Sequence, residues 1–136
     1  MERDDTMSLT IVTGPPCGGK TTHIATHATP GDIIIDLDRI ALALTTDNTG
    51  HHAYGTHIRH VALQARAAAI RAALPLAAHH NVWIIDSRPT RSSWAAYRQA
   101  HARHVTCDPG QHEVTRRATT QRPTWVLDLI ADWYRP

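Results

Sequence analysis

The sequence is poor in the features that mark several classes of protein. Its two cysteines, Cys17 and Cys107, form neither a CxxC pair nor a zinc-binding spacing, which favours a reduced cytosolic protein over a disulfide-stabilised one. No run approaches the roughly 18 apolar residues of a membrane span, and the acidic start MERDDTMSL has no apolar signal region. We therefore expect a cytoplasmic protein with no membrane partner and with residues 1–7 disordered.

Lysine is almost absent. The chain has 14 basic and 12 acidic residues, a formal charge of +2, and all the basic residues except Lys20 are arginines. This mild excess predicts salt-sensitive but not tight binding to polynucleotides. A single lysine that falls within a motif carries more weight than one of many.

The eleven histidines follow no metal-binding pattern. HExxH is absent, and the two closely spaced helical pairs, His23 with His27 and His57 with His60, offer two ligands where zinc needs three or four. We interpret the histidines as scattered surface residues.

Short apolar runs alternate with longer Ala-rich amphipathic segments, without repeats or linkers. Strands are expected at 8–13, 32–36, 81–86 and, weakly, 104–107, and helices at 20–28, 39–44, 56–78, 92–102, 111–119 and 124–134. Pro75 is expected to end or kink the third helix. The pattern predicts one α/β domain over residues 1–136, a three-layer sandwich with a four- or five-stranded parallel sheet. Ligands of such sheets bind beyond the carboxyl ends of the strands, where residues 14–21, Asp36, Asp86 and Asp108 fall.

Residues 14–21 (GPPCGGKT) match G-x-x-x-x-G-K-[ST], the phosphate-binding P-loop, and a predicted strand precedes them and a helix follows. Backbone N–H groups of such a loop surround the phosphates, the lysine reaches the β- and γ-phosphates, and the threonine ligates Mg²⁺. We expect ATP or GTP with Mg²⁺ as ligands, Lys20 as a catalytic residue and Thr21 as a metal ligand. The expected nucleotide-binding residues are Gly14, Pro15, Pro16, Cys17, Gly18, Gly19, Lys20, Thr21 and Thr22. Cys17 is either a redox sensor or a small tolerated residue.

Two carboxylates follow the second predicted strand, in Asp36-Leu-Asp38-Arg39. A kinase that phosphorylates a hydroxyl needs a carboxylate that accepts the proton and orients the group. Asp36 is the expected base and Asp38 the alternative, although either could simply cap the next helix. ATPases need a residue that positions water, and the Ser-Arg-Pro after Asp86 supplies none, so the pattern favours a kinase.

GPPCGGKTT, the strand ending in D-x-D-R and the arginines at 116–122 together resemble the small P-loop kinases of the polynucleotide kinase and zeta-toxin group, which includes phage-encoded nucleic-acid and nucleotide kinases. The resemblance implies a P-loop NTPase fold with an Arg-bearing lid, and Asp36 as general base. It further implies that Arg39, together with Asp38, contacts the substrate. A fifth strand and an attached phosphatase domain are not evident, and the acceptor is the least determined part.

The arginines at 116–122 resemble lid residues that neutralise charge during phosphoryl transfer. Arg116 and Arg117 are the expected catalytic pair, of which only one can reach a given phosphate from a helix, and Arg122 is expected at the adenine or ribose. A basic surface helix is the alternative for all three. Arg88, with Arg91 nearby, either binds substrate phosphate or is solvated.

Several further residues allow two interpretations. Asp86 holds Mg²⁺ through a water, or caps the turn that follows it. His51, His52 and Tyr54 line an acceptor pocket, or belong to an ordinary loop. Arg59 and Arg66 are a phosphate-contacting row on the long helix or, as we favour, a solvated face. The four tryptophans, with Leu127 and Ile130, are expected to pack the core; they are Trp83, Trp94, Trp125 and Trp133.

The sequence therefore predicts an ATP-dependent kinase that transfers the γ-phosphate to a hydroxyl, with a polynucleotide 5′-OH as the favoured acceptor. The alternatives are hydroxymethylated pyrimidine in phage DNA, a nucleoside or nucleotide, or a nucleotide sugar as for the zeta toxins. A non-catalytic nucleotide-binding module is a different class of answer. The expected partner is the nucleic-acid or nucleotide acceptor, and a homo-oligomer is left open.

Overall fold

The structure is a computed structural model and describes residues 8–46 and 54–136. The order of elements predicted from the sequence is confirmed in these residues, whereas the predicted disorder of residues 1–7 lies outside them. The elements are β1 (Leu9–Thr13), α1 (Lys20–His27), β2 (Ile33–Ile35), α2 (Leu37–Ala43), α3 (Thr56–Ala73), the 3₁₀ helix η1 (Leu74–Ala78), β3 (Val82–Ile85), α4 (Arg91–Gln99), β4 (Arg103–Thr106), α5 (Gln111–Gln121) and α6 (Val126–Tyr134).

The described strands form one parallel sheet of four, in the order β2-β3-β1-β4. Ile11 in β1 is in register with Ile84 of β3 and with His104 of β4. Every residue of β1 is buried, while three of the four residues of the edge strand β4 are exposed. This difference explains why β1, with the sequence LTIVT, has no charged residue and gives a clear strand signal, while β4, with the sequence RHVT, gives only a weak one.

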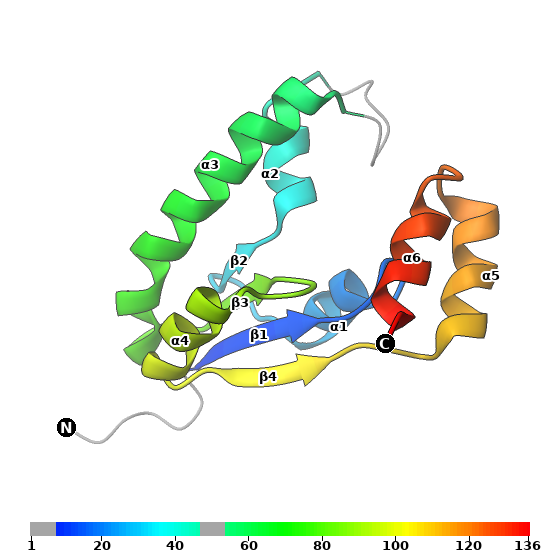
Figure 1. The fold of residues 1–136 in the computed structure, drawn as a ribbon. Coiled ribbons are helices and arrows are strands. Elements are labelled where there is room, and N and C mark those ends of the chain that lie inside the picture. The colour runs from blue at the N-terminus through cyan, green and yellow to red at the C-terminus, as the bar shows by residue number, and fades with distance from the viewer. Residues whose placement is uncertain (1–7, 47–53) are drawn as a thin grey trace.

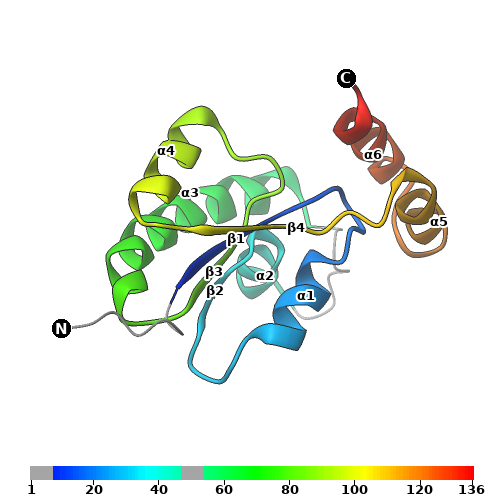
Figure 2. The same cartoon turned by 90° about the horizontal axis from the view of Figure 1, so that it is seen from below.

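Helices cover both faces of the sheet. Figures 1 and 2 together show α1 on one face and α3 and α4 on the other, which makes three layers. The main core lies between the sheet and the helices α3 and α4. Buried together there are Leu9, Ile11, Ile84, Tyr97 and Ala73. Pro75 lies at the start of η1, immediately after α3, so the predicted end of the long helix is confirmed.

The helices α5 and α6 form a hairpin beyond the carboxyl end of β4, to the right of the sheet in Figure 1. They have a small apolar core of their own, made by Val114, Ala118, Val126 and Ile130. The strand-end residue Asp108 serves this hairpin, because it accepts hydrogen bonds from the Tyr134 hydroxyl and from the Gly110 amide. A separately packed helical unit therefore lies beyond the carboxyl end of β4.

The expectation that all four tryptophans pack the core is wrong for Trp125. Its side chain is 51% exposed, whereas Trp94 packs against the main core. The indole of Trp83 donates to Asp32 (3.0 Å). Trp133 lies beneath the guanidinium of Arg88, 5.1 Å from it.

Residues Thr56–Ala78, which span α3 and η1, are long and apolar enough to cross a membrane by length and composition, with a mean hydropathy of 1.2. The expectation that no segment reaches this threshold is therefore too strict. One such helix is weak support for a membrane span, and α3 packs against α2 and β2 as part of the α/β fold.

Candidate functional site

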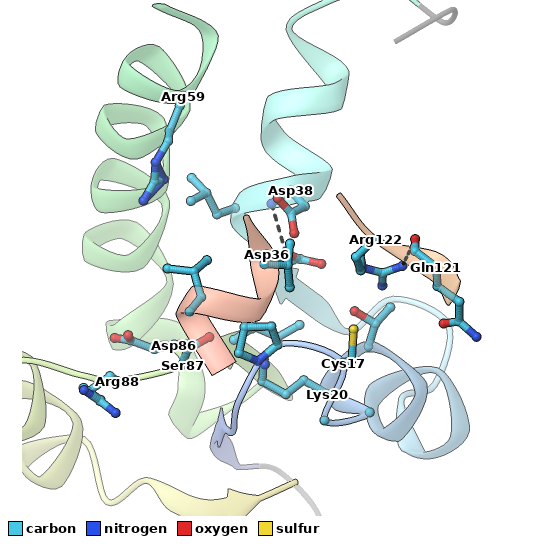
Figure 3. A pocket seen from close by; sticks show the side chains of 18 of the residues that line it. Cys17, Lys20, Asp36, Asp38, Arg59, Asp86, Ser87, Arg88, Gln121 and Arg122 are labelled. Atoms are coloured by element: carbon cyan, nitrogen blue, oxygen red, sulfur yellow. Dashed lines mark hydrogen bonds between the residues drawn. The ribbon is translucent and has the colours of Figure 1, made fainter. Parts of the chain in front are cut away.

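A cavity of about 1000 Å³ opens at the carboxyl ends of β1, β2 and β3. Residues 16–22 and the segment from Asp36 to Asp38 line it. One further wall is α3, and the opposite one is the turn between α5 and α6. Figure 3 shows Asp36 and Asp38 between Arg59 of α3 and Arg122 at the end of α5. Of the residues predicted at this edge of the sheet, 16–21, Asp36 and Asp86 line the cavity, whereas Gly14, Pro15 and Asp108 do not.

The loop of residues 14–21 passes so close to Cys107, the residue after β4, that two of its positions need glycine. A Cβ atom added at Gly14 would lie 2.2 Å from the carbonyl oxygen of Cys107, and one at Gly18 would lie 2.4 Å from the same oxygen. The backbone at Gly14, Cys17 and Gly19 has positive φ (149°, 61° and 95°). Glycine at these contacts therefore permits the loop to fold against its neighbouring strand.

The lysine of the loop turns back over it. Lys20 Nζ donates to the carbonyl oxygens of Gly14 (2.9 Å) and Pro15 (2.7 Å). Burial lowers the pKa of Lys20 below its ordinary value of 10.5, although Cys107, Cys17 and Asp36 act in the opposite direction. The ammonium is thus held at the mouth of the loop by neutral carbonyls, which a phosphate group would outcompete as a partner.

Thr21 and Thr22 line the cavity from the first turn of α1. No side chain caps this helix, whose N-cap residue is Gly19. The first amide groups of α1 therefore point toward the cavity edge without a side-chain acceptor, an arrangement that suits an anionic ligand.

The two carboxylates after β2 have different local partners. Asp36 is 6% exposed and caps α2, because its Oδ1 accepts a hydrogen bond from the Asp38 amide (3.1 Å). Asp38 accepts a hydrogen bond from the hydroxyl of Tyr54. Burial, together with this bond, raises the pKa of Tyr54 far above its ordinary value, so the phenol remains a donor. The capping role foreseen for Asp36 is confirmed, and the residue also lines the cavity.

The tandem arginines of α5 separate as their helical spacing requires. Arg117 lines the cavity and donates from Nη1 to the carbonyl oxygen of Cys17 (3.1 Å). Arg116 does not line it; its side chain is 61% exposed and binds Glu113 through two hydrogen bonds (2.9 and 2.6 Å). Bonds from both arginines lower the pKa of Glu113 to about 2. Arg122 also lines the cavity, so two of the three predicted lid arginines reach it.

Asp86 is held from two sides. Its Oδ2 accepts a hydrogen bond from the Tyr97 hydroxyl (2.9 Å) and lies 3.5 Å from Nη2 of Arg66. Arg66 also donates to the carbonyl oxygen of Ile85 (2.8 Å), and its side chain is only 18% exposed. The expectation of a solvated face is therefore wrong for Arg66. Arg59 is exposed, yet it lines the same cavity from the same helical face, two turns before Arg66.

Of the predicted substrate-binding arginines, Arg39 lies outside the cavity and Arg88 is bound by backbone carbonyls. Arg39 is exposed on α2 and does not line the cavity. Arg88 lines it but donates to the carbonyl oxygens of Asp132 (3.3 Å) and Trp133 (3.0 Å), which attaches the end of α6 to the turn after β3. Tyr54 lines the cavity, in line with the first of its two interpretations, while His51 and His52 lie outside the described residues.

Sequence reasoning missed the apolar part of the cavity wall. Leu63, Trp125 and Leu129 line the cavity and are 40%, 51% and 46% exposed. The sequence signal that could have revealed this wall is the broad apolar face of α6. Val126 and Ile130 on this helix are buried in the core of the hairpin, whereas Leu129 is exposed to the cavity.

The residues that line the cavity suit Mg²⁺ better than a metal ion whose ligands all come from protein side chains. Within residues 8–46 and 54–136, no three His, Cys, Asp or Glu side chains gather as a metal site. Mg²⁺ keeps several waters and takes one or two protein oxygens together with phosphate oxygens. Thr21 and Asp86, which line the same cavity, provide that kind of partial donor set.

Comparison of the chain with protein-family models and with curated proteins finds no match to either.

Proposed function

We propose that the protein is a P-loop kinase that transfers the γ-phosphate of ATP to a hydroxyl group, with a polynucleotide 5′-OH as the favoured acceptor. The observation that carries this proposal is the shared cavity of the Lys20 loop and the Asp36 carboxylate. A phosphate-binding loop alone is compatible with a nucleotide-binding module. A nearly buried carboxylate on the same cavity adds a group suited to activate an acceptor.

The donor side comprises the loop, the first turn of α1 and the lid. Loop amides and the helix N-terminus bind the phosphates, and Lys20 exchanges its carbonyl partners for phosphate oxygens. Thr21 would ligate Mg²⁺ directly, and Asp86 would hold one of its waters through Oδ1, because Oδ2 is engaged by Tyr97 and Arg66. When bound, Mg²⁺ neutralises charge on the phosphate oxygens.

The acceptor side centres on Asp36. Its carboxylate orients the acceptor hydroxyl and accepts its proton. The hydroxyl oxygen then bonds to the γ-phosphorus while the bond from that phosphorus to the β–γ bridging oxygen breaks, so ADP leaves and the proton passes from Asp36 to solvent. Asp38, held by Tyr54, lies next to this group and is the alternative base.

Arg117 is the lid residue best suited to stabilise the transferring phosphoryl group. Both arginines bind Glu113, but Arg117 also contacts the loop through Cys17 and lines the cavity, whereas Arg116 does not line it. The charge that develops on the phosphoryl oxygens would attract its guanidinium from the carbonyl of Cys17. We assign Arg122 to the base or ribose, and we place the reaction in the cytoplasm, where ATP and reduced thiols coexist.

The direct test is transfer of labelled γ-phosphate to a panel of acceptors. The panel contains 5′-OH DNA and RNA, hydroxymethylated DNA, nucleosides, mononucleotides and a nucleotide sugar. The proposal expects labelled 5′-phosphate on a polynucleotide, and label on another hydroxyl would keep the kinase but change its acceptor. Release of free phosphate with every acceptor unlabelled would contradict it and favour an NTPase.

A further inference from the structure

Half of the large apolar side chains that are exposed in the described residues line one cavity. Among the described residues, six large hydrophobic side chains are exposed: Leu44, Val61, Leu63, Leu76, Trp125 and Leu129. Three of them, Leu63, Trp125 and Leu129, line this one cavity. Phosphates and carbohydrate hydroxyls gain little from such a lining, whereas the face of an aromatic ligand gains by leaving water.

Trp125 is the most exposed of these side chains. In the part of the chain that the structure describes, its indole makes no hydrogen bond and no ring contact, unlike Trp83, Trp94 and Trp133. It lies at the N-cap position of α6, three residues after Arg122. A tryptophan left half exposed inside a cavity is available to stack with a planar ligand.

The opposite wall combines charge with apolar surface. Arg59, Leu63 and Arg66 lie one turn apart on α3, at the spacing that places side chains on one helical face, and all three line the cavity. A ligand between the walls would therefore meet an aromatic face on one side and leucine flanked by guanidinium groups on the other. A nucleotide unit, with its planar base and its phosphate, has this combination of groups.

The position of the carboxylates separates the acceptor from the donor. Figure 3 shows Asp36 and Asp38 between Arg59 on α3 and Arg122 on the turn that leads to Trp125. A group that contacts both walls lies over these carboxylates, away from the loop that binds the donor phosphates. The cavity, at about 1000 Å³, is at the upper end of the range for ligand sites, which allows for two bound nucleotides.

We propose that Trp125 stacks on the nucleobase next to the hydroxyl that is phosphorylated, with Leu63 and Leu129 completing the apolar site. The inference rests on the proposed kinase function and deepens it, because it requires an acceptor that carries a base at the reacting end. Trp125 is then a specificity-determining residue, and removal of either the indole or the base has the same consequence.

Two 5′-OH DNA oligonucleotides test this assignment: one with an ordinary terminal base, the other identical except for an abasic terminal nucleotide. Trp125→Ala should raise KM for the first by about tenfold, within the roughly 5- to 150-fold range that base–aromatic stacking gives, and leave KM for the abasic one unchanged. Trp125→Phe should retain most of the affinity. Leu76→Ala, at a position 45% exposed but outside the cavity, is the matched control and should change neither value.

Equal losses for the two oligonucleotides would overturn the assignment, and a raised KM for ATP would move Trp125 to the donor base. Binding without ATP tests the stacking independently of turnover. The base-bearing oligonucleotide should quench tryptophan fluorescence more than the abasic one, and Trp125→Phe should abolish that difference. If the difference appears but no labelled product forms, the kinase proposal fails and the stacking site stands. If transfer occurs with no such difference, the stacking site fails and the kinase stands.

Discussion

Arg117 donates a hydrogen bond from Nη1 to the carbonyl oxygen of Cys17, 3.1 Å away, and so joins α5 to the loop of residues 14–21 across a hundred positions of sequence. The neighbouring Arg116 points out of the cavity and is bound by Glu113. The side chain of Cys17 also packs against the apolar core of the α5–α6 hairpin. The α5–α6 hairpin thus contacts the loop through one polar and one apolar interaction at Cys17.

This difference between adjacent arginines makes a matched pair of variants. Arg117→Ala should lower kcat by about 10³, the lower end of what a transition-state arginine contributes in phosphoryl transfer. Arg116→Ala should change kcat by no more than about twofold, as expected for an exposed residue outside the site. Steady-state kinetics decides, and equal losses in the two variants would refute the assignment of Arg117.

The close contact of the loop with β4 predicts intolerance at Gly18. Gly18→Ala should lower the free energy of unfolding by about 2 kcal/mol or more, because its Cβ would lie 2.4 Å from the Cys107 carbonyl oxygen and backbone must move. Gly55→Ala is the control, since its Cβ would meet only the movable imidazole of His57, and it should cost about 1 kcal/mol or less. Urea unfolding measures both; similar costs would argue against the tight packing of loop and strand.

Nucleotide affinity should fall at alkaline pH earlier than an ordinary lysine would require. Burial lowers the pKa of Lys20, so its ammonium is lost at a midpoint below 10.5, and phosphate binding weakens there. The free energy of unfolding of the unliganded protein should change in the opposite direction. The buried charge of Lys20 destabilises the fold at neutral pH, and this penalty is lost as pH rises from the native pKa toward 10.5, so stability increases.

Equilibrium binding of ATP as a function of pH measures this alkaline limb, the fall in affinity at high pH. Lys20→Arg keeps its charge throughout the window and should lack the limb, whatever its absolute affinity. A midpoint at or above pH 10.5 in the unmodified protein would be inconsistent with a buried lysine at the loop.

Two cavity arginines on α3 should differ in their effect on stability. Arg66→Met removes the bonds to Ile85 and Asp86 and should lower the free energy of unfolding by about 2 kcal/mol, typical of hydrogen bonds to a charged group. Arg59→Met, on the same helix and cavity but exposed, should change it by no more than about 0.5 kcal/mol. Equal thermal or urea stability of the two variants would show that Arg66 is not structural.

The fold was largely predictable because its signals are local. Alternating β-branched runs and Ala-rich segments predict the element order, and a strand buried on both faces, such as β1, is rich in β-branched residues and has no charged one. The strand order depends on contacts between distant segments, which periodicity does not encode. The edge strand β4 was also hard to predict from sequence. Three of its four residues are exposed, so its sequence has no apolar alternation that would mark it as a strand.

The site was predictable where a backbone motif defines it and less so where tertiary contacts do. The loop and Asp36 follow from spacing and from their position after strands. The engagement of Arg88 by the end of α6, and of Asp86 by Arg66 and Tyr97, depends on packing between elements far apart in sequence. Trp125 was misassigned because hydrophobic character alone does not distinguish a core residue from one that lines a cavity.

The central claim, that Asp36 activates an acceptor hydroxyl, is tested most directly by Asp36→Asn. Asparagine is as good an N-cap as aspartate, so it preserves the bond to the Asp38 amide while removing the proton acceptor. Labelled γ-phosphate transfer should fall by about 10²–10⁴, the usual contribution of a general base, with ATP affinity and unfolding free energy retained. Asp38→Asn, measured in parallel, should lose far less. Transfer at the unmodified rate in Asp36→Asn, with the protein folded and ATP bound, would contradict the account.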